Sequence, residues 1–176
     1  MSEERKKIIR ALGAELALTP AEASIQGAVD RAAELAAQPG VYMPQQFENP
    51  ANPKCHFATT AQEIWEQMDG NVAAFVAGVG SGGTLQGVGA YLKEQNPACH
   101  VVAVEPANVS ALLGHEPGLH QIQGIGDGFI PAVLDVSLVD DVVEVTDEDA
   151  IETARALART EGLLVGTSSG ASVWAS

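Results

Sequence analysis

The sequence is short of positive charge. Its 176 residues include nine Lys and Arg against 23 Asp and Glu, which gives a formal net charge of −14. Four of these cations lie within residues 5–10, and only two follow Lys93. A protein that binds nucleic acid must neutralise a row of phosphates with Lys and Arg. The charge balance therefore argues against a nucleic-acid partner.

Cysteines, aromatic residues and long apolar runs are also scarce. Cys55 and Cys99 are the only cysteines, and no metal-ligand spacing surrounds them, as expected for reduced thiols in a cytoplasmic protein. No apolar run approaches the roughly 20 residues that span a bilayer, and charged residues stand where a signal peptide would be apolar. We therefore predict a soluble, cytoplasmic protein without a membrane partner.

One glycine-rich stretch stands out. Residues 77–84 read Ala-Gly-Val-Gly-Ser-Gly-Gly-Thr, and they follow the apolar run 72–76 and precede a helix-prone segment, 85–94. A buried strand that turns at once into a helix directs backbone N–H groups and the positive end of the helix dipole into one cleft. The stretch therefore predicts a phosphate site at Gly80, Ser81, Gly82, Gly83 and Thr84.

The glycine pattern by itself is also compatible with two other interpretations. The stretch can be a tight strand-to-helix turn without a ligand. It also satisfies G-x-G-x-x-G through Gly78, Gly80 and Gly83, and Glu105 follows at the distance at which a nicotinamide-binding fold places its ribose carboxylate.

The rest of the chain alternates between helix and strand patterns, which predicts parallel strands with crossover helices. The turn-rich Asn49-Pro50-Ala51-Asn52-Pro53 is the clearest break and a candidate hinge. We expect Thr146 to cap a helix that runs through Arg159. Residues 106–127 should be irregular. The other expected helices cover residues 2–12 (capped by Ser2), 21–37 and a segment through Ile64-Trp65, and the expected strands cover residues 15–18, 41–46, 72–76, 100–104, 137–145 and 163–165.

Several ordered segments together resemble the cysteine synthase (O-acetylserine sulfhydrylase) family of fold type II pyridoxal-phosphate enzymes. They are Pro44 to Pro53, Glu63-Ile64-Trp65, Gly78 to Thr84, Val104-Glu105-Pro106, Ile122 to Pro131 and Gly166 to Gly170. The resemblance implies a tryptophan synthase β-like α/β fold with mostly parallel sheets and helices on both faces. A nicotinamide-binding fold predicts neither the Gln-Gln-Phe segment at 45–47 nor the second small-residue turn.

The resemblance also implies roles for individual residues. Gly80 to Thr84 would hold the phosphate of pyridoxal 5'-phosphate, and Ser168 would meet its pyridine nitrogen. Ser168 can also cap a helix, and the two roles are compatible. Gln46 would bind the substrate carboxylate, and the backbone of Gly124, Ile125 and Gly126 would contact the amino-acid substrate. Asp127 departs from the small residue common there, and it is either a solvated loop residue or a determinant of substrate preference. The four histidines have no partner spacing and are assigned no role.

The family's Schiff-base lysine has no counterpart here. None of Lys6, Lys7, Lys54 and Lys93 has a suitable position. The resemblance implies an incomplete chain that begins and ends inside the family's sequence, with residues 1–49 as the later half of a small mobile domain and 50–176 as the central part of the large cofactor domain. We expect such a chain to be catalytically inactive alone.

The implied reaction is the replacement of acetate in O-acetylserine by sulfide, which makes cysteine. The alternatives are a cystathionine β-synthase or threonine dehydratase type of enzyme, or a non-catalytic binding protein. The resemblance also implies a homodimer in the complete form and serine acetyltransferase as a candidate partner.

Overall fold

The computed structural model describes residues 3–176, which divide into two compact units, Met1–Met43 and Pro44–Ser176. We expected the division after residue 49. The expected cap Ser2 lies outside the described residues. No helix in the described part of the chain is both long and apolar enough to cross a membrane.

The first unit is helical. It contains α1 (Glu3–Ala11), a short 3-10 helix η1 (Ala21–Ala23) and α2 (Ser24–Ala36). Gly13 ends the first helix with a φ of +84°, as its position after Leu12 predicts. The strands expected at 15–18 and 41–46 are absent from the described residues, and that prediction was wrong. An extended segment becomes a strand only when a neighbouring strand accepts and donates its backbone hydrogen bonds, and these two segments have no such neighbour.

The second unit is built on a parallel sheet with the order β1-β2-β3. Its strands are β1 (Ala74–Gly78), β2 (His100–Pro106) and β3 (Asp141–Val145). The register pairs Phe75 with Val101 and Ala103 with Val142. The predicted α/β class with parallel strands is confirmed.

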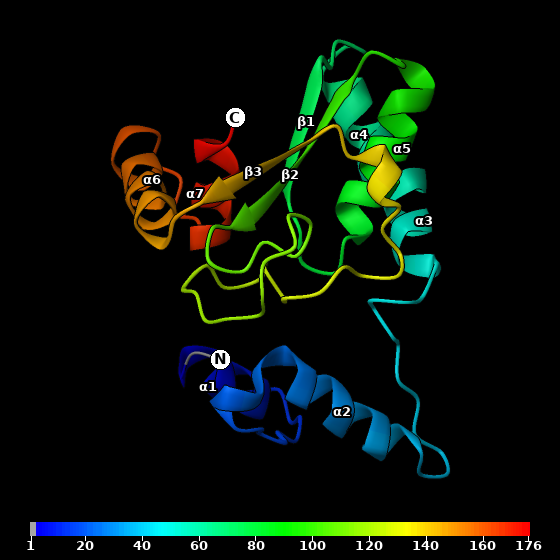
Figure 1. Ribbon diagram of the computed structural model, residues 1–176, viewed down its shortest axis with the longest axis vertical. Helices are drawn as coiled ribbons and strands as arrows, with labels where there is room; N and C mark the ends of the chain where they lie inside the picture. Colours follow the sequence, from blue (N-terminus) through cyan, green and yellow to red (C-terminus); the bar gives the residue numbers. More distant parts are fainter. Residues whose placement is uncertain (1–2) are drawn as a thin grey trace. The chain divides into compact units, whose positions relative to one another are not determined.

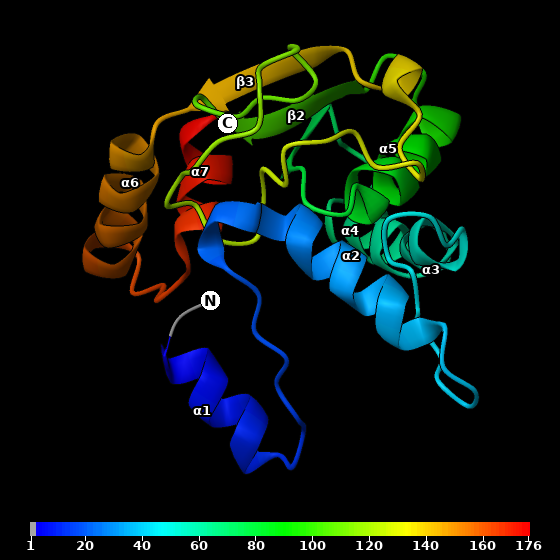
Figure 2. The ribbon, with the colours of Figure 1, turned by 60° about the horizontal axis from the view of Figure 1, so that its bottom comes forward.

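Helices cover both faces of this sheet (Figures 1 and 2), as predicted. On one face, Ala77 and Ala103 pack with Leu85 of α5 (Gly83–Gln95). On the other face, Val104 and Val145 pack with residues of the last two helices. The helices beside α5 are α3 (Ala51–Ala58) and α4 (Thr60–Gln67), and those on the opposite face are α6 (Asp147–Thr160) and α7 (Thr167–Trp174).

Several element boundaries differ from expectation. The strand expected over 137–145 is divided into a 3-10 helix η2 (Val136–Leu138) and β3, because the Asp135 side chain accepts from the backbone N–H of Ser137 and caps a turn there. The expected strand 163–165 is exposed irregular chain, with Leu164 94% exposed, and it joins no sheet within residues 3–176. The expected hinge at 49–53 includes the start of α3. Thr146 does cap α6, since its hydroxyl oxygen accepts from the Asp149 N–H at 3.1 Å.

Candidate cofactor site

The glycine-rich stretch connects the end of β1 at Gly78 to the start of α5 at Gly83. Gly82 precedes α5 in the left-handed conformation, with a φ of +77°, which a side chain would disfavour. No side chain caps this end of the helix. The first N–H groups of a 13-residue helix are therefore left to an outside acceptor, and an anion suits them best.

The other glycines of the stretch are needed because other segments come very close. A Cβ on Gly80 would lie 2.6 Å from the carbonyl oxygen of Gly124, and one on Gly78 would lie 2.7 Å from Cγ2 of Ile125. A Cβ on Gly83 would overlap the side chain of Asn52. Of these four glycines only Gly82 has a positive φ, and close packing is a sufficient reason for glycine at the other three. The expectation that they also let the backbone approach a ligand stays a prediction.

The second loop of the site, residues 122–128, is fastened directly to the first. The Gly126 N–H donates to the Val79 carbonyl at 2.9 Å. His120 holds the same turn, because its Nδ1 accepts from the Ile122 N–H at 3.1 Å and its Nε2 lies 3.0 Å from the Gly126 carbonyl. An Nδ1 that accepts leaves the ring proton on Nε2, which can then donate to that carbonyl. The predicted substrate residues Gly124, Ile125 and Gly126 are thus adjacent to the phosphate loop.

Asp127 is half-buried in this second loop. Burial raises the pKa of its carboxyl group, and His120 opposes the rise when its ring is protonated. Its proposed influence on substrate preference stays a prediction.

Ser168 lies at the start of α7, near the second loop. Its Oγ is 4.0 Å from the position that a Cβ on Gly124 would take. Three segments that are far apart in the sequence therefore meet: the phosphate loop, the loop at 122–128 and the turn before α7. Ser168 lies in the first turn of the helix and does not act as its cap residue, which is Gly166.

The Gln46 side chain is exposed, whereas its backbone is held near the phosphate loop. The Gln46 carbonyl accepts from Nδ2 of Asn52 at 2.9 Å, and the same Nδ2 donates to Ser81 Oγ at 3.0 Å. Phe47 anchors the segment further through an edge-to-face contact with Phe129, whose ring centroid lies 5.0 Å away. The predicted carboxylate role of Gln46 is not tested by these contacts.

Two residues of this site escaped the sequence analysis. Asn52 was interpreted as part of a hinge and His56 was given no role, yet α3 brings both to the phosphate loop. Nε2 of His56 lies 3.2 Å from Thr84 Oγ1. The available signal was their spacing of four residues, which places both side chains on one face of a helix.

The structure also bears on the nicotinamide alternative. Glu105 is 2% exposed, and its Oε2 accepts from the Ser110 hydroxyl at 2.8 Å and from the Leu112 N–H at 3.0 Å. A carboxylate that is buried at the end of β2 and bonded to the segment that follows this strand is not available to the ribose of a dinucleotide.

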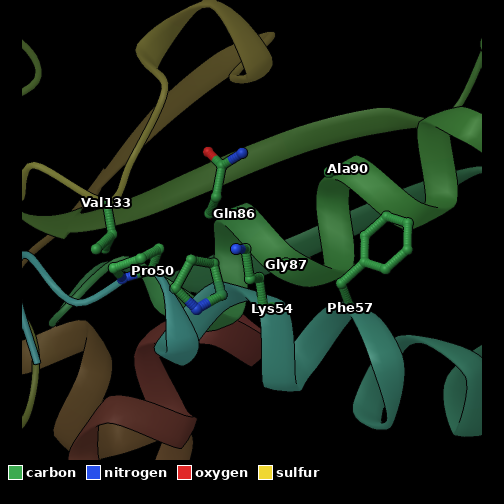
Figure 3. A pocket seen from close by; sticks show the side chains of 8 residues that line it. Pro50, Lys54, Phe57, Gln86, Gly87, Ala90 and Val133 are labelled. Carbon is green, nitrogen blue, oxygen red and sulfur yellow. The ribbon is translucent and has the colours of Figure 1, made fainter.

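None of the four lysines takes part in the site contacts described above. Lys6 pairs with Glu3 in the first unit, and Lys93 pairs with Asp140 at the far end of α5. Lys54 is exposed and lines a mostly apolar groove of about 240 Å³ between α3 and α5 (Figure 3). Phe57, Gln86 and Ala90 also line this groove, which none of the predicted phosphate residues lines.

An α/β unit in which a glycine-rich strand-to-helix loop meets two further small-residue turns has the architecture of the fold type II pyridoxal-phosphate enzymes. The chain belongs to the pyridoxal-phosphate dependent enzyme family, which matches residues 1–176. The uncapped start of α5 and the hydroxyls of Ser81 and Thr84 beside it fit a bound phosphate group.

Similar proteins include cysteine synthases. The cysteine synthase of Staphylococcus aureus (strain Mu50 / ATCC 700699) is 47% identical over 176 residues, which are 99% of this chain and 57% of that protein. The crystal structure of cysteine synthase from Entamoeba histolytica matches with a TM-score of 0.89 and 41% identity, over 98% of this chain and 52% of that one. The O-acetylserine dependent cystathionine beta-synthase from Helicobacter pylori matches with a TM-score of 0.92 and 46% identity, over 99% of this chain and 57% of that one. The chain thus spans just over half the length of these relatives.

Proposed function

We propose that residues 1–176 form the cofactor-binding central part of a cysteine synthase. In the reaction, the bond between the β-carbon and the acetate oxygen of O-acetylserine breaks, and a bond from that carbon to sulfide sulfur forms. Acetate leaves and cysteine is the product. The observation that carries the proposal is the meeting of the phosphate loop, the loop at 122–128 and Ser168 in one unit of a pyridoxal-phosphate family member.

Bound pyridoxal phosphate would supply the electron sink that makes the substrate α-proton acidic. The N–H groups at the start of α5 and the hydroxyls of Ser81 and Thr84 would bind its phosphate. The Ser168 hydroxyl would donate a hydrogen bond to the pyridine nitrogen without giving it a full proton. A neutral partner leaves the ring a weaker sink, which suits a substrate with a good leaving group such as acetate.

The amide of Gln46 would hold the substrate carboxylate, and the backbone of Gly124 to Gly126 would line the amino-acid side of the site. These assignments are supported by the position of the Gln46 backbone beside Asn52 and by the contact of Gly124 with Gly80. An amide hydrogen-bonds a carboxylate without adding a charge to the site.

We also propose that this chain does not turn over substrate by itself. The family resemblance implies a lysine that holds the cofactor and moves the α-proton. Lys93 pairs with Asp140, and Lys54 is exposed beside a groove that none of the phosphate residues lines, which supports the proposal that neither has that role. Lys6 and Lys7 belong to α1 of the first unit, whereas the site contacts lie within the second unit. The complete enzyme would be cytoplasmic, which the free thiols of Cys55 and Cys99 support. By its family resemblance it would be a homodimer, with serine acetyltransferase as a candidate partner.

A chimera tests the reaction. Residues 1–176 would replace the matching 176-residue segment of the Staphylococcus aureus cysteine synthase, which keeps its own flanking segments. We expect the chimera to make cysteine from O-acetylserine and sulfide. A folded chimera that binds pyridoxal phosphate but prefers homocysteine to sulfide would support the cystathionine β-synthase alternative. A folded chimera that binds the cofactor and turns over neither would contradict the proposed function.

A further inference from the structure

Both hydroxyls of the phosphate loop meet side chains of α3. Nδ2 of Asn52 lies 3.0 Å from Ser81 Oγ, and Nε2 of His56 lies 3.2 Å from Thr84 Oγ1. Asn52 and His56 are one helical turn apart, so a single helix reaches both hydroxyls. The direction of these two hydrogen bonds decides whether the hydroxyl protons are free to face an anion.

The Asn52 bond has a fixed direction. Nδ2 of Asn52 also bonds the Gln46 carbonyl at 2.9 Å, and a carbonyl oxygen can only accept. The atom that faces it is therefore the amide nitrogen, which donates its second N–H to Ser81 Oγ. Ser81 accepts from α3 and keeps its own proton for another partner.

The His56 bond can run in either direction. Nδ1 of His56 lies 3.0 Å from Oγ1 of Thr60, the first residue of α4. If Thr60 donates to Nδ1, the ring proton sits on Nε2 and is donated to Thr84 Oγ1. In the reverse direction the Thr84 proton is used up on Nε2, and only oxygen lone pairs remain to face the phosphate, which they would repel.

We infer that Thr60 donates to His56 Nδ1, that His56 Nε2–H donates to Thr84 Oγ1, and that the Thr84 proton is thereby kept for the cofactor phosphate. The inference rests on the proposed cofactor site. It makes Asn52, His56 and Thr60 positioning residues, which act on the phosphate through Ser81 and Thr84. Both loop hydroxyls then have the same polarity: each accepts from α3 and donates to the anion.

The close packing of α3 on α5 keeps this arrangement in place. A Cβ on Gly83 would overlap the Asn52 side chain, and one on Gly87 would lie 2.7 Å from His56 Cβ and 2.9 Å from the Phe57 backbone nitrogen. The two helices therefore approach closely enough for side chains of α3 to reach the first turn of α5.

The first test compares two neighbouring threonines in the full chain. Thr60→Val removes the hydroxyl that sets the His56 tautomer. Thr59→Val is the matched control, because the Thr59 hydroxyl donates to the Cys55 carbonyl at 2.8 Å, at the C-terminal end of α3 and away from His56 Nδ1. We expect Thr60→Val to weaken pyridoxal phosphate binding about 3- to 10-fold, because the hydrogen bond from Thr84 to the charged phosphate is lost only in the fraction of molecules whose His56 ring changes tautomer. Thr59→Val should leave the Kd unchanged.

Variants of His56 give an independent readout. His56→Leu removes the donor and should weaken pyridoxal phosphate binding by about 10-fold or more, whereas His56→Gln keeps an N–H donor and should recover most of the affinity. Binding of pyridoxal, which lacks the phosphate, should be the same in all variants. Equal losses for pyridoxal and pyridoxal phosphate would mean a merely structural role and would overturn the inference.

Nitrogen-15 NMR of the His56 ring tests the tautomer directly. In mildly alkaline buffer, where an ordinary histidine is neutral, we expect the proton on Nε2 in protein saturated with inorganic phosphate. A proton on Nδ1 would overturn the inference. Failure of the wild-type chain to bind either phosphate or pyridoxal phosphate would overturn the cofactor site and the inference with it, whereas normal binding with equal Kd values for Thr60→Val and Thr59→Val would overturn the inference alone.

Discussion

The charged form of Asp127 destabilises the folded chain because its carboxyl group is partly buried, and a protonated His120 only partly offsets this effect. Burial raises the pKa of its carboxyl group, so in the window between the unfolded and folded pKa values the folded chain binds more protons. The contribution of this residue to stability therefore falls as the pH rises through that window. A charged His120 beside it reduces the effect.

We expect Asp127→Asn to raise the free energy of unfolding at neutral pH by less than about 1 kcal/mol. The gain should shrink as the pH falls and wild-type Asp127 takes up its proton. Urea unfolding at neutral and acidic pH measures both effects. A loss of stability at neutral pH would show that the charged carboxylate has a favourable partner, contrary to this account.

Asn52 shows why the site could be predicted only in part. Three small-residue segments could be recognised in the sequence, because glycine and serine after a strand predict a turn locally. They are the phosphate loop and residues 122–128 and 166–170. The contact of Asn52 with Ser81 depends on how α3 packs against α5, because the two residues are 29 positions apart in the sequence. No local pattern around an Asn-Pro turn contains that information.

The packing of α3 against α5 depends on glycines within α5. A Cβ on Gly87 would overlap the Pro53 carbonyl and come within 2.9 Å of the Phe57 nitrogen, and backbone atoms cannot move aside cheaply. We expect Gly87→Ala to destabilise the chain by about 1–3 kcal/mol, despite the better helix propensity of Ala. Thermal unfolding followed by circular dichroism measures the change.

Gly89→Ala is the matched control on the same helix. Its Cβ would meet side-chain carbons of Leu138 and Val101 at 3.2 Å, and side chains can shift. We therefore expect Gly89→Ala to lower the free energy of unfolding by less than Gly87→Ala does. If both substitutions lowered the free energy of unfolding equally, the close approach of α3 to Gly87 would not be what makes this position sensitive.

Asp140 joins α5 to the sheet. Its Oδ1 accepts from Lys93 Nζ at 2.8 Å and its Oδ2 accepts from the Val101 N–H at 2.7 Å. The hydrogen bond from Lys93, and after it that from Val101, lowers the pKa of this carboxyl group. A carboxyl group whose folded pKa is lowered stabilises the protein above its unfolded pKa, and the stabilisation is lost as the pH falls through the folded pKa.

Asp140→Asn should therefore lower the urea midpoint at neutral pH and have little effect once the pH is below the folded pKa. Asp141→Asn is the control, because Asp141 pairs with the exposed His100, and exposed ion pairs contribute little. A pH-independent loss for Asp140→Asn would mean that the charge of Asp140 is not what holds α5 to the sheet.

At the element level, helices were easier to predict than strands. Thr146, with its acidic first turn, marks the start of α6 locally, and the structure has the cap at that residue. The segments 15–18, 41–46 and 163–165 have strand-like composition, but a strand also needs a partner, and the sequence of one segment does not say whether a partner lies beside it.

At the scale of the whole chain, the site contacts described above lie within the second unit, Pro44–Ser176. We therefore expect a chain that starts at residue 44 to bind inorganic phosphate with the same Kd as the full chain. Isothermal titration of both proteins makes the comparison. A large loss of affinity in the shorter chain would show that the first unit contributes to phosphate binding.

We propose that this chain has the phosphate site of a pyridoxal-phosphate enzyme but not the lysine that bonds the cofactor. Borohydride reduction of the purified chain with pyridoxal phosphate, followed by mass spectrometry, tests it most directly. We predict saturable thermal stabilisation by pyridoxal phosphate and by inorganic phosphate, and no stoichiometric adduct at a single lysine. A stoichiometric adduct at one position such as Lys54, or no stabilisation by either anion, would contradict the claim.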